Sequence, residues 1–383
     1  MILSELLSVE ILRVIWWALL GILLIGFALT DGFDFGTAIL LPFVAKTDVQ
    51  RRVVINTVGP VWEGNQVWFI LGGGAIFAAW PILYAVSFSG FYLALFAVLF
   101  ALIIRPVSFK YRSKRDSKRW RNNWDRSLFI SGFLPALLFG VTMGNVLQGA
   151  PFHLTEDMRP FYTGSFFGLL NPFALLAGLV SLFMMIMHGA AWICIKADGP
   201  IVERARIYGA WAALITAATF TLAGIFMFFG IEGYQFINEV DHNGPSNPLF
   251  NEVVRGGTWL TAYEIRPWIA IAPISGILGA LMAWRAMRSK GEVVTLLWSK
   301  LSITGIIATV GLTMFPFILP SSTDPNSSLT VWDSSSSQLT LFVMLVATVI
   351  FMPLIMLYTA WVYKVLWGKV AEADVTENSS SLY

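Results

Sequence analysis

The chain has 383 residues, of which 57% are hydrophobic and 13% are charged, and its formal net charge is +2. This composition excludes a soluble globular protein and requires lipid as the solvent. Hydrophobic stretches of about 20 residues recur with no large polar domain between them, which predicts membrane-spanning helices rather than a barrel. The single cysteine, Cys194, excludes an intrachain disulfide and any site with several cysteine ligands.

In chain order, the hydrophobic stretches predict nine spans and therefore an all-α polytopic membrane protein. The first stretch lacks the basic start and the cleavage site of a signal peptide, so we expect it to stay in the protein. The boundary between the second and third spans is the least defined, because Pro81 can kink a helix as well as separate two. We expect one transmembrane domain over residues 1–369 and a short polar cytoplasmic tail over residues 370–383. The predicted spans are 11–44, 53–80, 82–104, 127–147, 170–193, 207–230, 268–284, 301–319 and 338–363.

The distribution of basic residues predicts how these spans are oriented. Of the 25 lysines and arginines, 21 fall in segments on one side of the nine-span scheme. Because cytoplasmic loops carry most of the lysine and arginine, this side is the cytoplasmic one. The N-terminus is then periplasmic and the C-terminus is cytoplasmic. The basic segments are 45–52, 105–126, 194–206, 285–300 and 364–383.

Two loops beside the spans have distinctive compositions. Residues 105–126 form the most basic loop, which we interpret as an anchor to lipid headgroups and not as a nucleic-acid site, since basic clusters beside spans are a normal topological signal. The serine-rich residues 321–338 are predicted to form an external loop whose last serines cap the ninth helix.

Three acidic residues fall inside the predicted spans, Asp31 and Asp34 in the first and Glu63 in the second. Apart from Arg13, which is counted with the outer end of the first span, the nine-span scheme places no lysine or arginine inside any span. Asp34 lies about 18 Å along the helix from Lys46, and Glu63 lies about 16 Å from Arg52, so the acids are expected at similar depth. Because a short loop joins the first two spans, we expect the three acids to be neighbours.

Two interpretations of "TDGFD", residues 30–34, stay open at this point. An ionised carboxylate is costly to bury in a membrane, and clustered carboxyls can share and pass protons, so the three acids predict a proton path. Alternatively, the first span ends near Leu29, and the segment is a helix cap or a turn near the interface, with Asp31 and Gly32 as turn residues.

The residues around Glu63, "GPVWEGNQVW", are polar for a membrane span. Asn65 and Gln66 can form hydrogen bonds between helices, and Pro60 frees a backbone carbonyl. Of the three histidines only His188 falls in a span, and one histidine without a second ligand does not make a convincing haem or metal site. We therefore expect no metal and no redox cofactor bound by this chain alone.

Several long motifs, in the same order along nearly the whole chain, resemble subunit II of the cytochrome bd quinol oxidase. They are "GFALTDGFDFG", "VWEGNQVW", "FAAWPILYAVSFSGFY", "RPVSFKYRSK", "WRNNWD", "GNVLQGAPF", "YTGSFFGLLNPFALLAG", "MFPFILPSST" and "WDSSSSQLTL".

This resemblance implies a respiratory complex of the bacterial cytoplasmic (inner) membrane that oxidises quinol and reduces dioxygen to water, consuming cytoplasmic protons. It implies that this chain is the haem-free, nine-helix subunit, catalytic only within a heterodimer with subunit I. In that family, subunit I carries two b haems, haem d and the quinol-oxidising loop. The resemblance leaves room for a structural quinone or lipid in this chain and for small single-span accessory subunits.

Residue by residue, the resemblance implies that Asp34 and Glu63 help to deliver protons, with Asp31 as a further candidate one turn away. Some family members carry aspartate where this chain has Glu63, so the carboxyl is kept but displaced by about one methylene. The glycine of "TDGFD" is expected to interrupt the first helix, so that water can reach the acids. The supporting candidates are Trp62, Asn65, Gln66, Trp68 and Arg105, the last as an electrostatic partner at the cytoplasmic end.

Two competing hypotheses make different predictions. An autonomous secondary transporter that uses buried carboxylates would take up substrate into liposomes that contain this chain alone. A purely structural scaffold would keep its turnover in an assembled complex after Asp34→Asn and Glu63→Gln substitutions.

Overall fold

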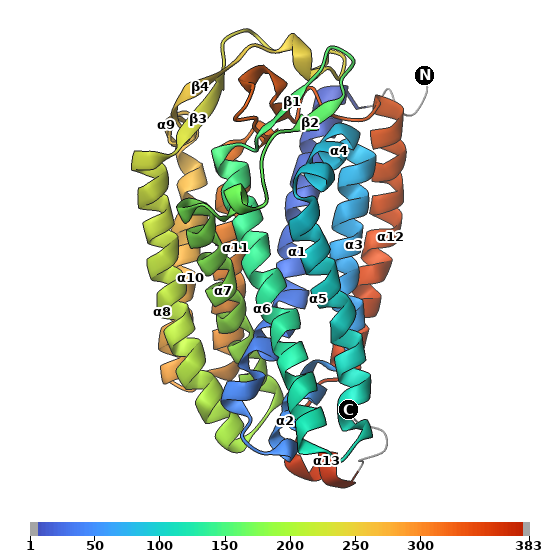
Figure 1. Ribbon diagram of the computed structural model, residues 1–383, viewed down its shortest axis with the longest axis vertical. Helices are drawn as coiled ribbons and strands as arrows, with labels where there is room; N and C mark the ends of the chain where they lie inside the picture. The colour runs from blue at the N-terminus through green and yellow to red at the C-terminus, as the bar shows by residue number, and fades with distance from the viewer. Residues whose placement is uncertain (1–6, 378–383) are drawn as a thin grey trace.

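The computed structural model describes residues 7–377 and consists mainly of long helices that run side by side along one axis (Figure 1). Within these residues, eight helices are long and hydrophobic enough to cross a membrane. The prediction of a polytopic helical membrane protein is therefore confirmed. The eight are α1 (Val9–Val44), α5 (Tyr92–Tyr111), α6 (Lys118–Gln148), α7 (Pro172–Lys196), α8 (Gly199–Gly230), α10 (Ile271–Arg288), α11 (Glu292–Met314) and α12 (Gln338–Val365).

The segment predicted as the second span is divided into two helices. α2 (Asp48–Val58) ends at a short turn, after which α3 (Trp62–Ala79) begins and runs beside α1 and α12 (Figure 1). The 18 residues of α3 include a polar first turn, which lowers its hydropathy below that of the eight spans. α4 (Pro81–Gly90) then starts at Pro81. Proline is favoured at the first position of a helix because it has no N–H group, and the first N–H groups of a helix have no partner within the helix.

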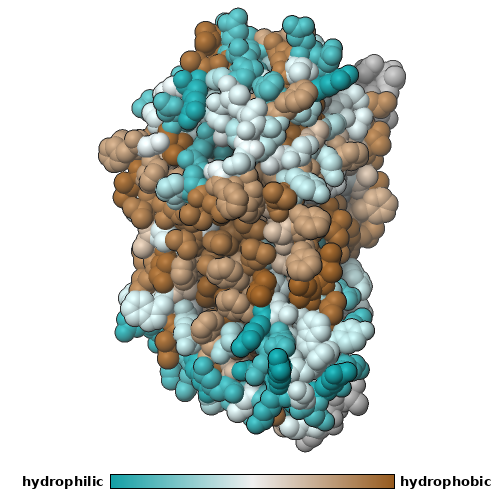
Figure 2. All heavy atoms as spheres, in the orientation of Figure 1, coloured by the Kyte–Doolittle hydropathy of each residue, from teal (hydrophilic) through white to brown (hydrophobic). Residues whose placement is uncertain are grey.

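A hydrophobic belt lies between two hydrophilic ends on the face shown in Figure 2. This distribution is what a bilayer requires, because the hydrocarbon region accepts apolar side chains and the interfaces accept polar ones. The basic segments 45–52 and 105–126 lie at the end that carries α2 and α13 (Glu372–Glu377), which we call the basic end.

Three small antiparallel hairpins lie in the loops at the opposite end, so the all-α prediction holds for the spans and not for these loops (Figure 1). Their backbone groups leave the helices and must find partners within the loops. They pair β1 (Phe152–Leu154) with β2 (Pro160–Tyr162), β3 (Glu232–Phe236) with β4 (Val253–Thr258), and β5 (Phe317–Leu319) with β6 (Leu329–Thr330).

Helix α1 lies inside the bundle, in contact with α3, α6, α7 and α11. Its approach to α7 is very close, since a Cβ atom built on Gly36 would lie 1.9 Å from the carbonyl oxygen of Met185. Small residues allow helix backbones to meet in this way in membranes. α1 is helical through residues 30–34, so two predictions for this segment are wrong: it neither interrupts the helix nor caps it. Gly32 serves helix packing, because a Cβ there would lie 2.6 Å from Sδ of Met185.

The expectation that, apart from Arg13, no lysine or arginine lies inside a span is also wrong. Arg13 lies in α1 and Arg105 in α5, and each side chain is buried. Arg13 donates to Ser335 Oγ at 2.8 Å and to the carbonyl of His242 at 2.7 Å in the loops. Hydropathy alone does not predict these positions, because the cost of burying a cation depends on the partners that other segments supply.

The predicted serine cap before the last long helix can be checked directly. Ser337 caps α12 by accepting a hydrogen bond from the amide of Thr340, which confirms the predicted cap. Within the tail, α13 packs against α2 and buries Val375 completely. The described part of the tail is therefore docked on the basic end.

Candidate proton-transfer site

The candidate site begins with two buried carboxyl groups on α1. Asp31 is 0% exposed and Asp34 is 2% exposed, and they lie about one turn apart on the same face of the helix. The helix continues for ten residues beyond Asp34, to Val44, so neither acid lies at a helix end. The prediction that these two acids are buried is confirmed.

Asp31 forms an ion pair with Arg105 of α5. The Nη1–Oδ1 distance is 2.6 Å, and each side chain is at most 1% exposed. The guanidinium group also lies 4.3 Å from the centre of the Phe35 ring, which gives it a second favourable contact. Arg105, predicted as a partner at the cytoplasmic end, is therefore a partner inside the bundle.

Asp34 has a different set of partners. Its Oδ2 accepts a hydrogen bond from Asn65 Nδ2 at 2.8 Å, and Asn65 Oδ1 accepts one from Tyr363 Oη at 2.6 Å. Asn65 comes from the first turn of α3, and Tyr363 from the last turns of α12. This chain of bonds confirms that Asn65 bonds across helices and adds Tyr363, for which no local sequence pattern gives a signal.

Two oxygens of the acid pair, Oδ2 of Asp31 and Oδ1 of Asp34, are buried without a hydrogen-bond partner in the protein. The pair has two carboxyl groups beside one guanidinium group, so full ionisation would leave one uncompensated negative charge. A single proton on this pair removes that charge and supplies a donor for a free oxygen. The pair can therefore hold and release a proton.

Glu63 does not join the two aspartates, so the predicted cluster of three buried acids is wrong. Its side chain is exposed at the first turn of α3, on the helix face that also carries Val67, Ile70 and Phe77. Equal depth along two helices does not decide which way a side chain faces, and here the rotation of α3 turns Asn65 inward and Glu63 outward.

Of the remaining supporting candidates, Trp62 and Trp68 pack against other helices of this chain. Trp62 is buried, and its ring lies 5.5 Å from that of Phe109 in a stacked arrangement. Trp68 is half-buried beside Gly26, where a Cβ would lie 3.1 Å from the indole. Gln66 is half-buried.

A pocket of about 290 Å³ at the basic end reaches Tyr363. It is bounded by the turn after α2, by α7 and by the segment that follows α12, including the polar side chains of Asn56, Lys196, Lys369 and Asp374. Tyr363, which begins the chain of hydrogen bonds to Asp34, is one of the residues that line the pocket. Water in such a pocket has the polar partners that it needs.

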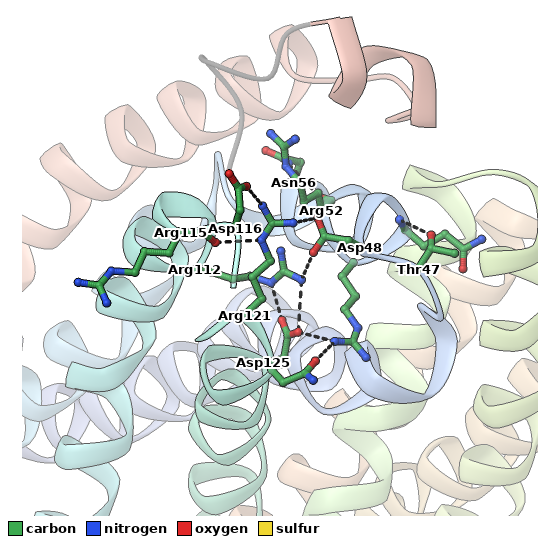
Figure 3. Close-up of polar contacts among 12 residues, drawn as sticks. Thr47, Asp48, Arg52, Asn56, Arg112, Arg115, Asp116, Arg121 and Asp125 are labelled. Carbon is green, nitrogen blue, oxygen red and sulfur yellow. Dashed lines mark hydrogen bonds and ion pairs between the residues drawn. The ribbon is translucent and has the colours of Figure 1, made fainter. Parts of the chain in front are cut away.

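The basic loop is bound to acids of this chain at the same end of the bundle. Figure 3 shows Asp125 and Asp48 between arginines, with Arg112 donating to both carboxylates at 2.5 Å and 2.9 Å and Arg121 donating to Asp48 at 2.8 Å. These bonds join the ends of α2, α5 and α6. Much of the basic loop therefore stabilises the helix ends, beside any contact with lipid.

His188, the histidine inside the bundle, forms hydrogen bonds through both ring nitrogens. His188 lies 2.8 Å from Ser299 Oγ through Nδ1 and 3.1 Å from the carbonyl of Leu29 through Nε2. Both ring nitrogens are thus used in helix–helix contacts. Among the described residues, no group of three or more histidine, cysteine, aspartate or glutamate side chains could hold a metal ion.

The fold and the site define a multi-pass helical membrane protein with a buried acid pair, a feature that marks sites for ions, protons or substrates. Residues 12–366 match the family of the cytochrome bd terminal oxidase subunit II. The chain belongs to this family, as its motifs predict.

Individual relatives agree with this assignment. The chain is 48% identical to the cytochrome bd-I ubiquinol oxidase subunit 2 of Escherichia coli K12, over 98% of this chain and 99% of that one. It is 46% identical, with the same coverage, to the probable cytochrome oxidase subunit 2 of Haemophilus influenzae. The bd oxidase of Geobacillus thermodenitrificans has a similar fold, with a TM-score of 0.68 at 15% identity over 93% of this chain and 98% of that one. The homologues are thus subunits of an oxidoreductase complex.

Proposed function

We propose that this chain is the haem-free subunit of a quinol:dioxygen oxidoreductase in the bacterial inner membrane, where it supports a haem-bearing subunit I and delivers cytoplasmic protons for the reduction of dioxygen to water. The observation that carries the proton role is the buried chain of contacts from the pocket at the basic end through Tyr363 and Asn65 to Asp34. Family membership supports the role in the complex.

In this proposal α3 is the ninth span, residues 1–369 form one transmembrane domain, the N-terminus is periplasmic and the basic end is cytoplasmic. The course of α3 beside α1 and α12 supports the ninth span (Figure 1). The excess of lysine and arginine at one end supports the orientation.

The docking face for subunit I is the outward face of α3. A charged side chain that faces lipid is costly within a span, and Glu63, in the first turn of α3, lies on the same exposed helix face as Val67, Ile70 and Phe77. A protein partner with polar groups at the depth of Glu63 removes this cost. Glu63 then transfers protons between this chain and subunit I. Single-span accessory subunits can bind to other exposed helix faces.

The redox cofactors, two b haems and haem d, belong to subunit I in this proposal, as does quinol oxidation. The hydrogen bonds of both His188 nitrogens support this division, since an iron ligand needs a free ring nitrogen. A structural quinone or a lipid remains compatible with the grooves on the outside of this chain.

Asn65 and Tyr363 act as positioning residues. A carboxamide is a poor proton carrier because transfer through it requires an unfavourable tautomer, whereas carboxyls and water exchange protons readily. Asn65 therefore holds the Asp34 carboxyl toward the polar pocket, and Tyr363 holds Asn65. Because the pocket ends at Tyr363 and is lined by neither Asn65 nor Asp34, protons reach Asp34 by way of water that enters past Tyr363 and Asn65, and Asp31 with its arginine keeps the charge of the site balanced.

The test compares oxygen consumption and haem absorbance of the assembled complex. We expect Asp34→Asn to reduce quinol-driven turnover by about 100-fold, the lower end of the contributions that positioned proton-transfer groups make, with haem content unchanged. Tyr363→Phe should have a smaller effect because the carboxyl remains. Asp116→Asn, the same chemical change at an exposed position, is the control.

Wild-type turnover in Asp34→Asn with full haem content would refute the proton role. Loss of haem in parallel with turnover would assign the acid pair to assembly. Uptake of a solute by liposomes containing only this chain would favour the transporter hypothesis.

A further inference from the structure

A groove on the outer surface of the bundle lies between the start of α8 and the end of α10. The two helices are neighbours, and the groove has a volume of about 390 Å³. Gly209 allows the helices to approach here, since a Cβ on it would lie 2.7 Å from Sδ of Met287. The groove does not overlap the candidate proton-transfer site.

The groove has a cationic end. Arg206 of α8 and Arg288 of α10 both line it, and both lie at the basic end of their helices. Arg206 meets Glu292 at 3.4 Å, a long contact, and the same oxygen of Glu292 accepts a bond from Lys369 at 3.1 Å. Lys369 also pairs with Asp198 at 2.9 Å, so two carboxylates serve these two cations, and Arg288 adds a third positive charge that leaves the group with a net charge of +1.

The remainder of the groove is hydrophobic and extends from the two arginines toward the middle of the spans. The Arg288 guanidinium lies 5.3 Å from the centre of the Trp284 ring, and both residues line the groove. Indole rings favour the boundary between headgroups and acyl chains. The hydrophobic lining consists of Ile207, Ala210, Trp211, Leu214, Trp284 and Met287.

We propose that this groove binds an anionic phospholipid, with the phosphate between Arg206 and Arg288 and one acyl chain along the hydrophobic lining. Charge complementarity selects this occupant: a site with two guanidinium groups and an incompletely neutralised excess of positive charge favours a headgroup with net negative charge. Basic pockets between spans on the cytoplasmic side are suited to such headgroups. A peptide chain would leave backbone groups unpaired along the hydrophobic part.

The test uses native mass spectrometry of the purified complex in detergent, titrated with phosphatidylglycerol. The variant Arg206→Gln/Arg288→Gln removes both cations of the groove. The matched control is Arg285→Gln/Lys290→Gln, which removes the same charge from the same end of α10 at positions that do not line the groove. Phosphatidylcholine tests headgroup charge, and inorganic phosphate as a competitor tests whether the acyl chain is needed.

We expect the groove variant to bind phosphatidylglycerol about 30-fold more weakly than wild type, because it removes two cations that attract the headgroup. The control variant should bind like wild type, phosphatidylcholine should bind more weakly, and inorganic phosphate should not compete. A second variant, Ala210→Phe, fills the groove and keeps both cations, and it should also lose the lipid.

The proposal would be overturned if the groove variant bound phosphatidylglycerol as tightly as wild type. It would also be overturned if the groove and control variants lost equal affinity for phosphatidylglycerol. Equal affinity for phosphatidylcholine would overturn the anionic selectivity, and competition by inorganic phosphate would make this a site for soluble anions. If a variant does not assemble, displacement of phosphatidylglycerol from wild type by inorganic phosphate decides the question. None of these outcomes depends on proton delivery.

Discussion

Removal of Arg105 should destabilise the chain more than removal of its partner Asp31. The ion pair spans 2.6 Å and is almost fully buried, so loss of one member leaves a charge without compensation. Such losses cost about 3–5 kcal/mol in protein interiors, and a charge pair at 4 Å with an effective dielectric constant of 20 gives a similar value, about 4 kcal/mol. We expect Arg105→Gln to cost about this amount, including the contact with Phe35.

Asp31→Asn should cost less, because Asp34 has a free buried oxygen nearby and can serve as the counter-ion of Arg105. No second cation can replace Arg105 in the same way, because Arg105→Gln leaves two carboxyl groups and no cation in the site. The double variant Asp31→Asn/Arg105→Gln should be less destabilised than the sum of the single variants by about 1–3 kcal/mol, as expected for contacting residues.

The assay is thermal or denaturant unfolding of the assembled complex in detergent, with haem absorbance as a measure of assembly. Arg51→Gln serves as a control, since its partner Asp125 keeps a second arginine, Arg112. Additive effects, or a larger loss for Asp31→Asn than for Arg105→Gln, would refute the reasoning about charge compensation.

Two further predictions concern packing and pH. Gly36→Ala should destabilise the chain by about 1–3 kcal/mol, because the new Cβ would lie 1.9 Å from the Met185 carbonyl, whereas Gly21→Ala in the same helix has no atom within 4 Å and should be neutral or slightly stabilising. In the serine-rich loop before α12, burial raises the pKa of Asp333 to about 6, above its ordinary 3.8, despite hydrogen bonds from Asn251 and Thr330. The folded state therefore binds more protons between these values, so the free energy of unfolding should fall by up to about 3 kcal/mol as the pH rises from 4 to 7.

Melting temperatures check both predictions. Equal values for the two glycine variants would contradict the close contact of α1 with α7. In Asp333→Asn, the melting temperature should decrease less steeply with rising pH than in wild type. If the melting temperatures of variant and wild type change with pH in parallel, the Asp333 carboxyl does not contribute to the pH dependence of stability.

The sequence by itself determined the features that depend on local composition. Membrane insertion selects each span by its own hydrophobicity, so the existence and order of the first helix and of the helices from α5 onward could be predicted. Their bounds were less accurate, because α5 begins ten residues after the predicted start and α6 and α11 each begin nine residues before it. The family could be identified because its motifs are continuous in sequence. Asp31 and Asp34 could be predicted as buried because they lie in the middle of a 36-residue hydrophobic helix.

Only the tertiary structure decided which side chains meet. Tyr363 and Asn65 are 298 residues apart, and Arg105 is 74 residues from Asp31, so their contacts depend on how α3, α5 and α12 pack around α1. The rotation of α3 about its axis turns Glu63 outward and Asn65 inward, although both lie in one helical turn. Hydropathy measures the transfer of a residue into lipid, whereas these positions follow from the fit of glycine-lined helix surfaces, such as that of α1 on α7.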